Sequence, residues 1–233
     1  MAIDILAYEP TELGILCLRR RDLVSRPDVS VTEITLNHEF LMSSYLTESE
    51  KSLSRVGLEM VRKSGVANEG IRVLVGGLGL GYTVVEALAA EDVQHVEVVE
   101  YLKEVIGWMA SGLVPLSEQL NAERRLKVTH GDVYARVTSA PESPFDLIAI
   151  DVDHSPEEVL GNQSMGFYTE VGLEKTMQHL ATGGVLGVWS YAEDTPLLAK
   201  MERVFDEVHV EQVTVWNDLI HEETTDWLFF GRK

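Results

Sequence analysis

The sequence has little cysteine, few basic side chains and no long apolar run. Its single cysteine, Cys17, excludes an internal disulfide and a metal site built from several cysteines, and it suits a reducing compartment. No stretch approaches the roughly 20 apolar residues of a membrane helix. The first ten residues, MAIDILAYEP, lack the basic start and the apolar core of a signal peptide. We therefore expect a cytoplasmic protein with no membrane partner.

Basic residues are outnumbered two to one, because 19 Lys and Arg stand against 38 Asp and Glu, for a net charge of −19. Such a surface repels the phosphates of nucleic acids and anionic membranes, so we expect no nucleic-acid partner. It attracts small cationic substrates such as amines. An acidic surface that only keeps the protein in solution is the alternative.

The first 44 residues differ in pattern from the rest. Short β-type runs are separated by turn residues, which predicts a small antiparallel appendage of two or three strands. The basic triplet Arg19-Arg20-Arg21 is expected to be a solvated strand end, with an anion or subunit contact as the alternative. We predict a β-rich region over 1–44 and an α/β catalytic domain over 45–233.

Residues 71–100 form the unit around which the second domain is organised. An apolar strand from Ile71 ends in a glycine-rich turn, a helix follows, and a second apolar strand stops on Glu100. Gly77, Gly79 and Gly81 are spaced as G-x-G-x-G. A dinucleotide fingerprint would need glycine at 82, where this chain has tyrosine, and no Gly-Lys-Ser/Thr follows for a P-loop. The pattern is typical of sites for S-adenosylmethionine-type nucleosides.

Strands and helices continue to alternate after this unit, which predicts a parallel sheet with helices on both faces. Among these elements we predict a strand over 145–150, a helix over 167–180 that Gly183-Gly184 closes, and a strand over 185–189. The last two β-type runs, 208–215 and 227–230, predict a closing antiparallel pair. The fold class is therefore α/β, with a seven-stranded, mostly parallel, methyltransferase-type (Rossmann-like) sheet behind the N-terminal β appendage.

Polar groups stand at the ends of four consecutive strands, where open α/β sheets bind ligands. The glycine turn follows the first strand, and Glu100, Asp132 and Asp151 end or follow the next three. Glu100 is placed to accept the hydroxyls of a ribose. Asp132 can accept the adenine amino group while the N–H of Val133 meets a ring nitrogen. An N-cap for the following helix is the alternative role of Asp132.

Asp151-Val152-Asp153-His154 is the stretch expected to hold chemistry. A partly buried Asp151 can accept a proton from an attacking ammonium or hold the amine in line, and Asp153 and His154 can assist. His154 as a loop or capping residue is the alternative. Asp153 and His154 also resemble half of a metal site, but no second ligand cluster supports one, so we expect no metal.

On these motifs, between about Leu36 and Arg232, the chain resembles the spermidine synthase (polyamine aminopropyltransferase) family. The matching segments are VLVGGLGLGYTVVEAL, VEVVE followed by YLKEVI, LKVTHGDVY, FDLIAID and FYTEVGLEKTMQHLATGGVLGVWS. The family transfers an aminopropyl group from decarboxylated S-adenosylmethionine to putrescine or a related amine and releases methylthioadenosine. The resemblance implies that Glu100 holds the ribose, Asp132 the adenine, and that Asp151 deprotonates or orients the amine. It also implies a homodimer through the N-terminal region.

Three departures from the family pattern leave the substrates open. Leu80 replaces the aspartate of the family's glycine turn, which binds the donor's amino group, and His154 stands where the second aspartate of D-[S/T]-x-D belongs. The polyamine gate has no clear match, although Tyr45, Glu48 and Glu50 can substitute. The co-substrate is S-adenosylmethionine or its decarboxylated form. A small-molecule methyltransferase and a non-catalytic nucleoside-binding protein remain the alternatives.

Overall fold

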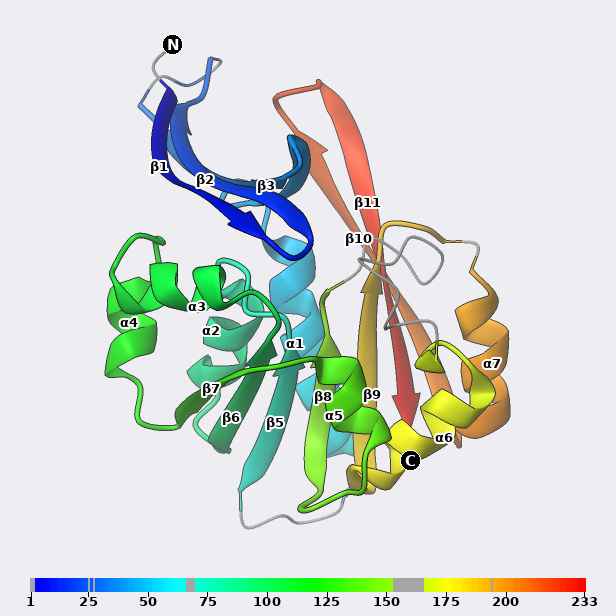
Figure 1. Cartoon of the computed structure of the whole chain (residues 1–233). Helices are drawn as coiled ribbons and strands as arrows, with labels where there is room; N and C mark the ends of the chain where they lie inside the picture. Colours follow the sequence, from blue (N-terminus) through cyan, green and yellow to red (C-terminus); the bar gives the residue numbers. More distant parts are fainter. Residues whose placement is uncertain (1–2, 25, 27, 66–69, 153–165, 194) are drawn as a thin grey trace.

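The computed structural model describes residues 3–24, 26, 28–65, 70–152, 166–193 and 195–233. Within these residues the chain forms two sheets, a four-stranded antiparallel sheet and a seven-stranded, mostly parallel sheet. Figure 1 shows the small sheet above the end of the large sheet at which the parallel strands finish. The predicted fold class is confirmed.

The large sheet has the strand order β10-β11-β9-β8-β5-β6-β7. Strands β5 to β9 run parallel to one another, and β11 pairs antiparallel with both β9 and β10, as the predicted closing pair requires. The bounds are β5 Ile71–Gly76, β6 Val93–Glu100, β7 Leu126–His130, β8 Phe145–Ile150, β9 Leu180–Ser190, β10 Glu207–Asn217 and β11 Glu222–Arg232.

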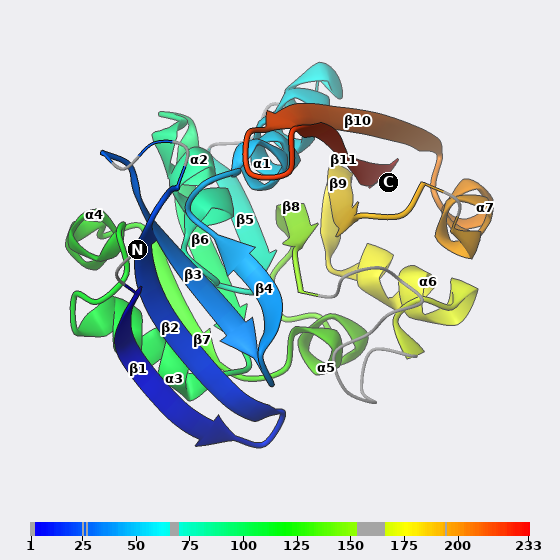
Figure 2. The same ribbon diagram turned by 90° about the horizontal axis from the view of Figure 1, so that it is seen from above.

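Both faces of this sheet are buried, which is why its central strands are apolar almost throughout. In β5, Val73 and Val75 belong to the core on one face, and Leu74 belongs to the core on the other. Figure 2 shows α1 and α2 on one side of the sheet and α5 and α6 on the other. The helices on the first face are α1 Glu48–Lys63, α2 Tyr82–Ala89, α3 Lys103–Ala110 and α4 Ser117–Ala122. Those on the second are α5 Val133–Thr138, α6 Glu170–Gln178 and α7 Pro196–Val204.

The pattern mislocated several element boundaries, among them the start of β9, and missed one helix, α4. The glycine pair Gly183-Gly184 was expected to close a helix, yet both residues lie inside β9, which begins at Leu180. A Cβ on Gly184 would lie 2.9 Å from the carbonyl oxygen of Ala181, so the strand needs glycine there. Helix α4 was not predicted, because its six residues are too few for a clear 3.6-residue period.

The N-terminal sheet has four strands, where two or three were expected: β1 Ile3–Thr11, β2 Gly14–Asp22, β3 Ser30–Leu36 and β4 Glu39–Ser43. Asn37 and His38 both have positive φ, which makes the tight turn that joins β3 to β4. The division of the chain at residue 44 stays a prediction.

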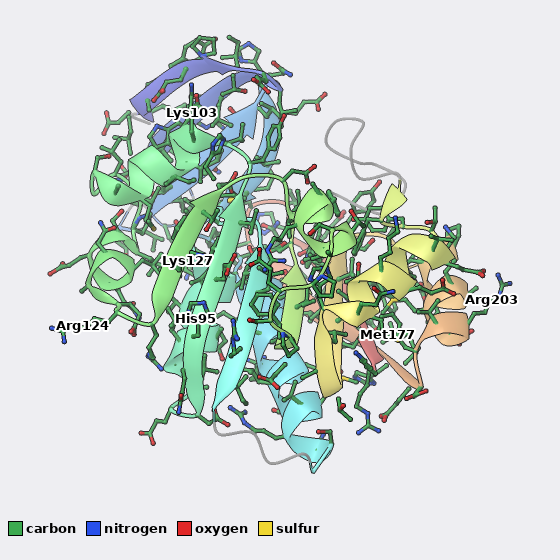
Figure 3. The ribbon with its side chains drawn as sticks, turned by 60° about the horizontal axis from the view of Figure 1, so that its bottom comes forward. His95, Lys103, Arg124, Lys127, Met177 and Arg203 are labelled. Carbon is green, nitrogen blue, oxygen red and sulfur yellow. The ribbon has the colours of Figure 1, made fainter. Side chains whose placement is uncertain are left out.

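Strand β7 is the edge of the large sheet that lies opposite β10, and Figure 3 places Lys127 on it. Its Nζ lies 3.6 Å from Glu97 Oε2 on the neighbouring strand. A lysine on an edge strand discourages pairing with another chain. Among the described residues, the structure contains no helix with the length and apolar character needed to span a membrane.

Candidate functional site

The glycine turn joins β5 to α2 and lies where these two elements meet β8. Gly77, Gly79 and Gly81 have φ of 90°, 52° and 93°, a region that favours glycine. A Cβ on Gly77 would lie only 2.4 Å from the carbonyl oxygen of Asp151. Glycine at 77 therefore lets the ends of β5 and β8 approach each other, and this brings Asp151 to the turn.

Glu100 is buried and ties the glycine turn to the end of β6. Its Oε2 accepts a hydrogen bond from the N–H of Leu78, and its Oε1 accepts one from the N–H of Leu102, both at 2.7 Å. Burial raises the pKa of this carboxyl, while the backbone N–H groups oppose that rise. The ribose-binding role of Glu100 stays a prediction.

Asp132 is the N-cap of helix α5, which confirms the alternative interpretation of this residue. Its Oδ1 accepts a 2.8 Å hydrogen bond from the N–H of Tyr134. This cap leaves Oδ2 available, so capping and adenine binding are compatible at Asp132. Val133, which follows, is buried.

These residues enclose a cavity of about 300 Å³, which we name the nucleoside cavity. Its acidic side chains are Glu100, Asp132 and Asp151, and its apolar walls include Val99, Leu102 and Val105. A mostly apolar cleft with a few convergent polar groups is the usual form of a small-molecule site. The strand-end residues therefore converge on one cavity.

Asp151 ends β8 beside Thr83, a residue that the sequence did not single out. The hydroxyl of Thr83 donates a 2.8 Å hydrogen bond to Asp151 Oδ2. Burial raises the pKa of Asp151 to about 6, the Thr83 hydrogen bond lowers it, and the charge of Asp226 raises it. A carboxyl with a pKa near the working pH suits a proton acceptor.

A second cavity, of about 560 Å³, lies on the other side of Asp151, and we name it the acidic cavity. Glu50 from α1 and Asp226 from β11 line it together with Asp151. Burial, with the charges of Asp151 and Asp226, raises the pKa of Glu50 to about 8. Burial also raises the pKa of Asp226. Neighbouring carboxyl groups in a partly buried site are not all ionised at once, because each negative charge raises the pKa of the others. A bound cation would favour their ionised forms.

Sequence reasoning missed Asp226 altogether. The available signal was a carboxylate directly before the apolar run that begins at Trp227. Of the predicted gate residues, Tyr45, Glu48 and Glu50 all line the acidic cavity. Glu48 lies close to Arg55, with its Oε1 2.6 Å from the guanidinium Nη2.

The two cavities share one junction, which Gly77, Gly79 and Asp151 line from the large sheet. Leu41 and Met42 line it from the N-terminal sheet. A Cβ on Gly79 would lie 2.7 Å from the sulfur of Met42, so this flexible side chain covers part of the turn. The junction therefore has one wall from each sheet.

Asp153 and His154 lie outside the described residues. Within the described ranges, no group of three or more His, Cys, Asp or Glu side chains is arranged to hold a metal ion.

Comparison with known proteins finds similar sequence and similar folds, although no protein-family model matches the chain. A polyamine aminopropyltransferase from Prochlorococcus marinus (strain MIT 9313) is 31% identical over 144 residues, which are 61% of this chain and 45% of that relative. The match therefore spans less than half of the relative's length.

Among solved structures, a spermidine synthase in complex with the transition state analogue AdoDATO has a TM-score of 0.75 at 16% identity, covering 99% of this chain and 74% of that one. The spermidine synthase from Thermotoga maritima has a TM-score of 0.72 at 15% identity, covering 99% and 72%. A probable spermidine synthase from Corynebacterium glutamicum ATCC 13032 has a TM-score of 0.64 at 17% identity, covering 97% and 79%. Part of the sequence is thus similar to a polyamine aminopropyltransferase, and the fold is similar to that of spermidine synthases.

Proposed function

We propose that this chain is a transferase of the spermidine synthase type. It moves an aminopropyl-type group from S-adenosylmethionine or its decarboxylated form to a small amine. The observation that carries the proposal is the position of Asp151 at the junction of the nucleoside cavity and the acidic cavity. A carboxyl there faces both substrates of a two-substrate reaction.

The nucleoside cavity fits the adenosyl end of the donor. Glu100 and Asp132 both line it and offer carboxyl oxygens to the ribose and the adenine, and Val99, Leu102 and Val105 supply apolar walls. The G-x-G-x-G turn then lies beside the sulfonium and the propyl chain. The structure described as holding AdoDATO has the same fold, which supports this placement.

The acidic cavity fits an amine. Glu50, Asp151 and Asp226 offer negative charge to an ammonium, and Trp189 and Tyr191 offer aromatic faces. The pKa of Glu50 is about 8 and that of Asp151 is about 6, so these carboxyls are partly protonated near neutral pH. A bound cation favours their ionised forms and so displaces the protons.

The reaction follows from this arrangement. The amine loses a proton to Asp151, and its nitrogen attacks the propyl carbon next to the sulfonium. A C–N bond forms as the C–S bond breaks, and the bonding pair goes to sulfur. The products are methylthioadenosine and the lengthened amine. Holding both reactants at one junction converts their encounter into a step within one complex.

Product analysis tests this proposal. The protein is incubated with each donor and a panel of amines, and the nucleoside product is identified by mass spectrometry. Methylthioadenosine is expected. S-adenosylhomocysteine would instead assign the methyltransferase alternative, and nucleoside binding without either product would assign the non-catalytic alternative.

Asp151→Asn is the variant for this assay. It should lower turnover at least about 100-fold, the usual contribution of a positioned proton acceptor, with donor affinity close to normal. Asp92→Asn is the matched control, because Asp92 pairs with Arg62 and lines neither cavity. Unchanged turnover in Asp151→Asn would remove Asp151 from the mechanism.

The homodimer and the cytoplasmic location belong to the same proposal. Ile3, Ile5 and Tyr8 of β1 are exposed apolar side chains, which supports a subunit contact through the N-terminal sheet. Cys17 is unpaired, as suits a reducing compartment. Light scattering of the purified protein tests the dimer, and a monomer at micromolar concentration would contradict it.

A further inference from the structure

Two arginines of the basic triplet face the acidic cavity instead of solvent. Side chains alternate across a strand, so Arg19 and Arg21 share one face of β2 and Arg20 takes the other. Arg19 and Arg21 are half-buried and line the acidic cavity, whereas Arg20 is exposed. The expected solvated strand end is therefore wrong for two of the three residues.

Both arginines are held in place by one buried carboxylate, Glu33 on β3. The Nε of Arg19 donates a 2.8 Å hydrogen bond to Glu33 Oε2, and the Nε of Arg21 donates a 2.7 Å hydrogen bond to Oε1. The Glu33 side chain is only 3% exposed. The Nη2 of each arginine also contacts Glu33, at 2.7 Å for Arg19 and 2.5 Å for Arg21. Two guanidinium groups on one carboxylate leave a net charge of +1, and the N–H donors on Nη1 of each guanidinium take no part in these contacts.

A basic pair in this position is unusual for the chain, whose net charge is −19. Two other basic side chains lie at the surface: Figure 3 shows Arg124 and Arg203 pointing away from the molecule, and the Arg203 side chain is 66% exposed. The acidic cavity thus has two kinds of charge on its walls. Glu50, Asp151 and Asp226 carry or share negative charge, and the arginine pair carries positive charge.

We propose that a substrate of the acidic cavity carries a carboxylate as well as an amine, and that Arg19 and Arg21 bind this carboxylate. The inference rests on the proposed function and names its substrate class. The ammonium lies against the three carboxyls and the carboxylate against the arginine pair, as charge complementarity requires. A guanidinium can donate two parallel hydrogen bonds to a carboxylate. A diamine without a carboxylate would leave these N–H donors unused.

The carboxylate has two sources. It belongs to the acceptor, if the acceptor is a diamino acid, or to the donor, if the donor is intact S-adenosylmethionine. Matched substrates separate them, because L-ornithine is putrescine with a carboxylate and S-adenosylmethionine is the carboxylated form of the other donor. Initial rates are measured for all four pairs of donor and acceptor.

We expect kcat/KM at least about tenfold higher with one carboxylated substrate than with its matched partner, the gain of one charge-assisted hydrogen bond. If the decarboxylated donor and putrescine form the best pair, the inference is overturned and the proposed function stands. If no pair gives methylthioadenosine, the proposed function fails, and the inference fails with it.

Variants assign the preference to the arginine pair. Arg21→Gln should lower the ratio of kcat/KM for the carboxylated substrate over its matched partner about tenfold, whereas Arg20→Gln, with the same change of charge outside the cavity, should leave the ratio unchanged. Glu33→Gln raises the net charge of the cluster to about +2 and should increase the ratio at least about threefold. These opposite signs separate carboxylate binding from a loss of folding. If neither Arg21→Gln nor Glu33→Gln changes this ratio of kcat/KM values, the inference is overturned.

Discussion

Replacing Thr83 by valine removes the hydroxyl that donates a 2.8 Å hydrogen bond to Asp151 Oδ2. This hydrogen bond favours the ionised carboxylate, so its loss should raise the pKa of Asp151 above about 6. A hydrogen bond to a charged group is worth about 1.5–3 kcal/mol, and one pKa unit corresponds to about 1.4 kcal/mol. Because Asp151 is half-buried and water can replace part of the lost contact, we take the lower end, a rise of about one unit.

The assay is the pH profile of kcat/KM between pH 5 and 9. If ionised Asp151 accepts the proton, the acid limb of the profile should move from about pH 6 to about pH 7 in the Thr83→Val variant. At pH 6 this shift corresponds to a loss of about fivefold in rate, and at pH 9 to almost none.

Thr83→Ser is the matched control, because it keeps a hydroxyl at the same place and should leave the acid limb where it was. An equal loss of rate at every pH in Thr83→Val would point to a disturbed fold instead of a changed pKa. An acid limb that does not move would refute the assignment of Asp151 as the titrating group.

Three further outcomes are expected. Asp226→Asn removes a negative charge that raises the pKa of Asp151, so the acid limb should move down by up to about one pH unit in the same assay. Glu100→Gln leaves one acceptor oxygen for two buried N–H donors, so the unfolding free energy should fall by about 1.5–3 kcal/mol in urea titrations, and binding of methylthioadenosine should weaken. Burial raises the pKa of Glu50 from 4.5 to about 8, so the folded state keeps a proton that the unfolded chain releases. The unfolding free energy should therefore fall as pH rises from 4.5 to about 8, and Glu50→Gln should flatten that slope.

The parts of the fold that a local sequence pattern marks, such as apolar runs and glycine turns, were predictable. Strand β8 was placed at its observed bounds, since six consecutive buried residues have no competing interpretation between their flanking turns. The glycine turn and the acids after it were found because parallel strands deliver their ends to one edge of a sheet.

The second cavity was not predictable in the same way. Asp226 and Thr83 reach Asp151 from β11 and α2, and no spacing in the chain relates these three residues. The pairing of Arg19 with Glu33 depends on the register between β2 and β3, where the two residues face each other across strands. Register is set by the folded sheet and its turns, so a basic triplet in sequence does not tell which arginines turn inward.

The N-terminal sheet supplies Met42 to the junction and the arginine pair to the acidic cavity, while the carboxyls proposed to bind and deprotonate the amine come from α1, β11 and the end of β8. The proposed carboxylate contacts and the proposed proton acceptor are thus encoded in separate stretches of the chain. A chimera that exchanges only residues 3–43 with a relative should inherit the relative's preference for or against a carboxylated substrate and keep its own proton acceptor. Substrate preference in this architecture can diverge by changes in the first strands alone.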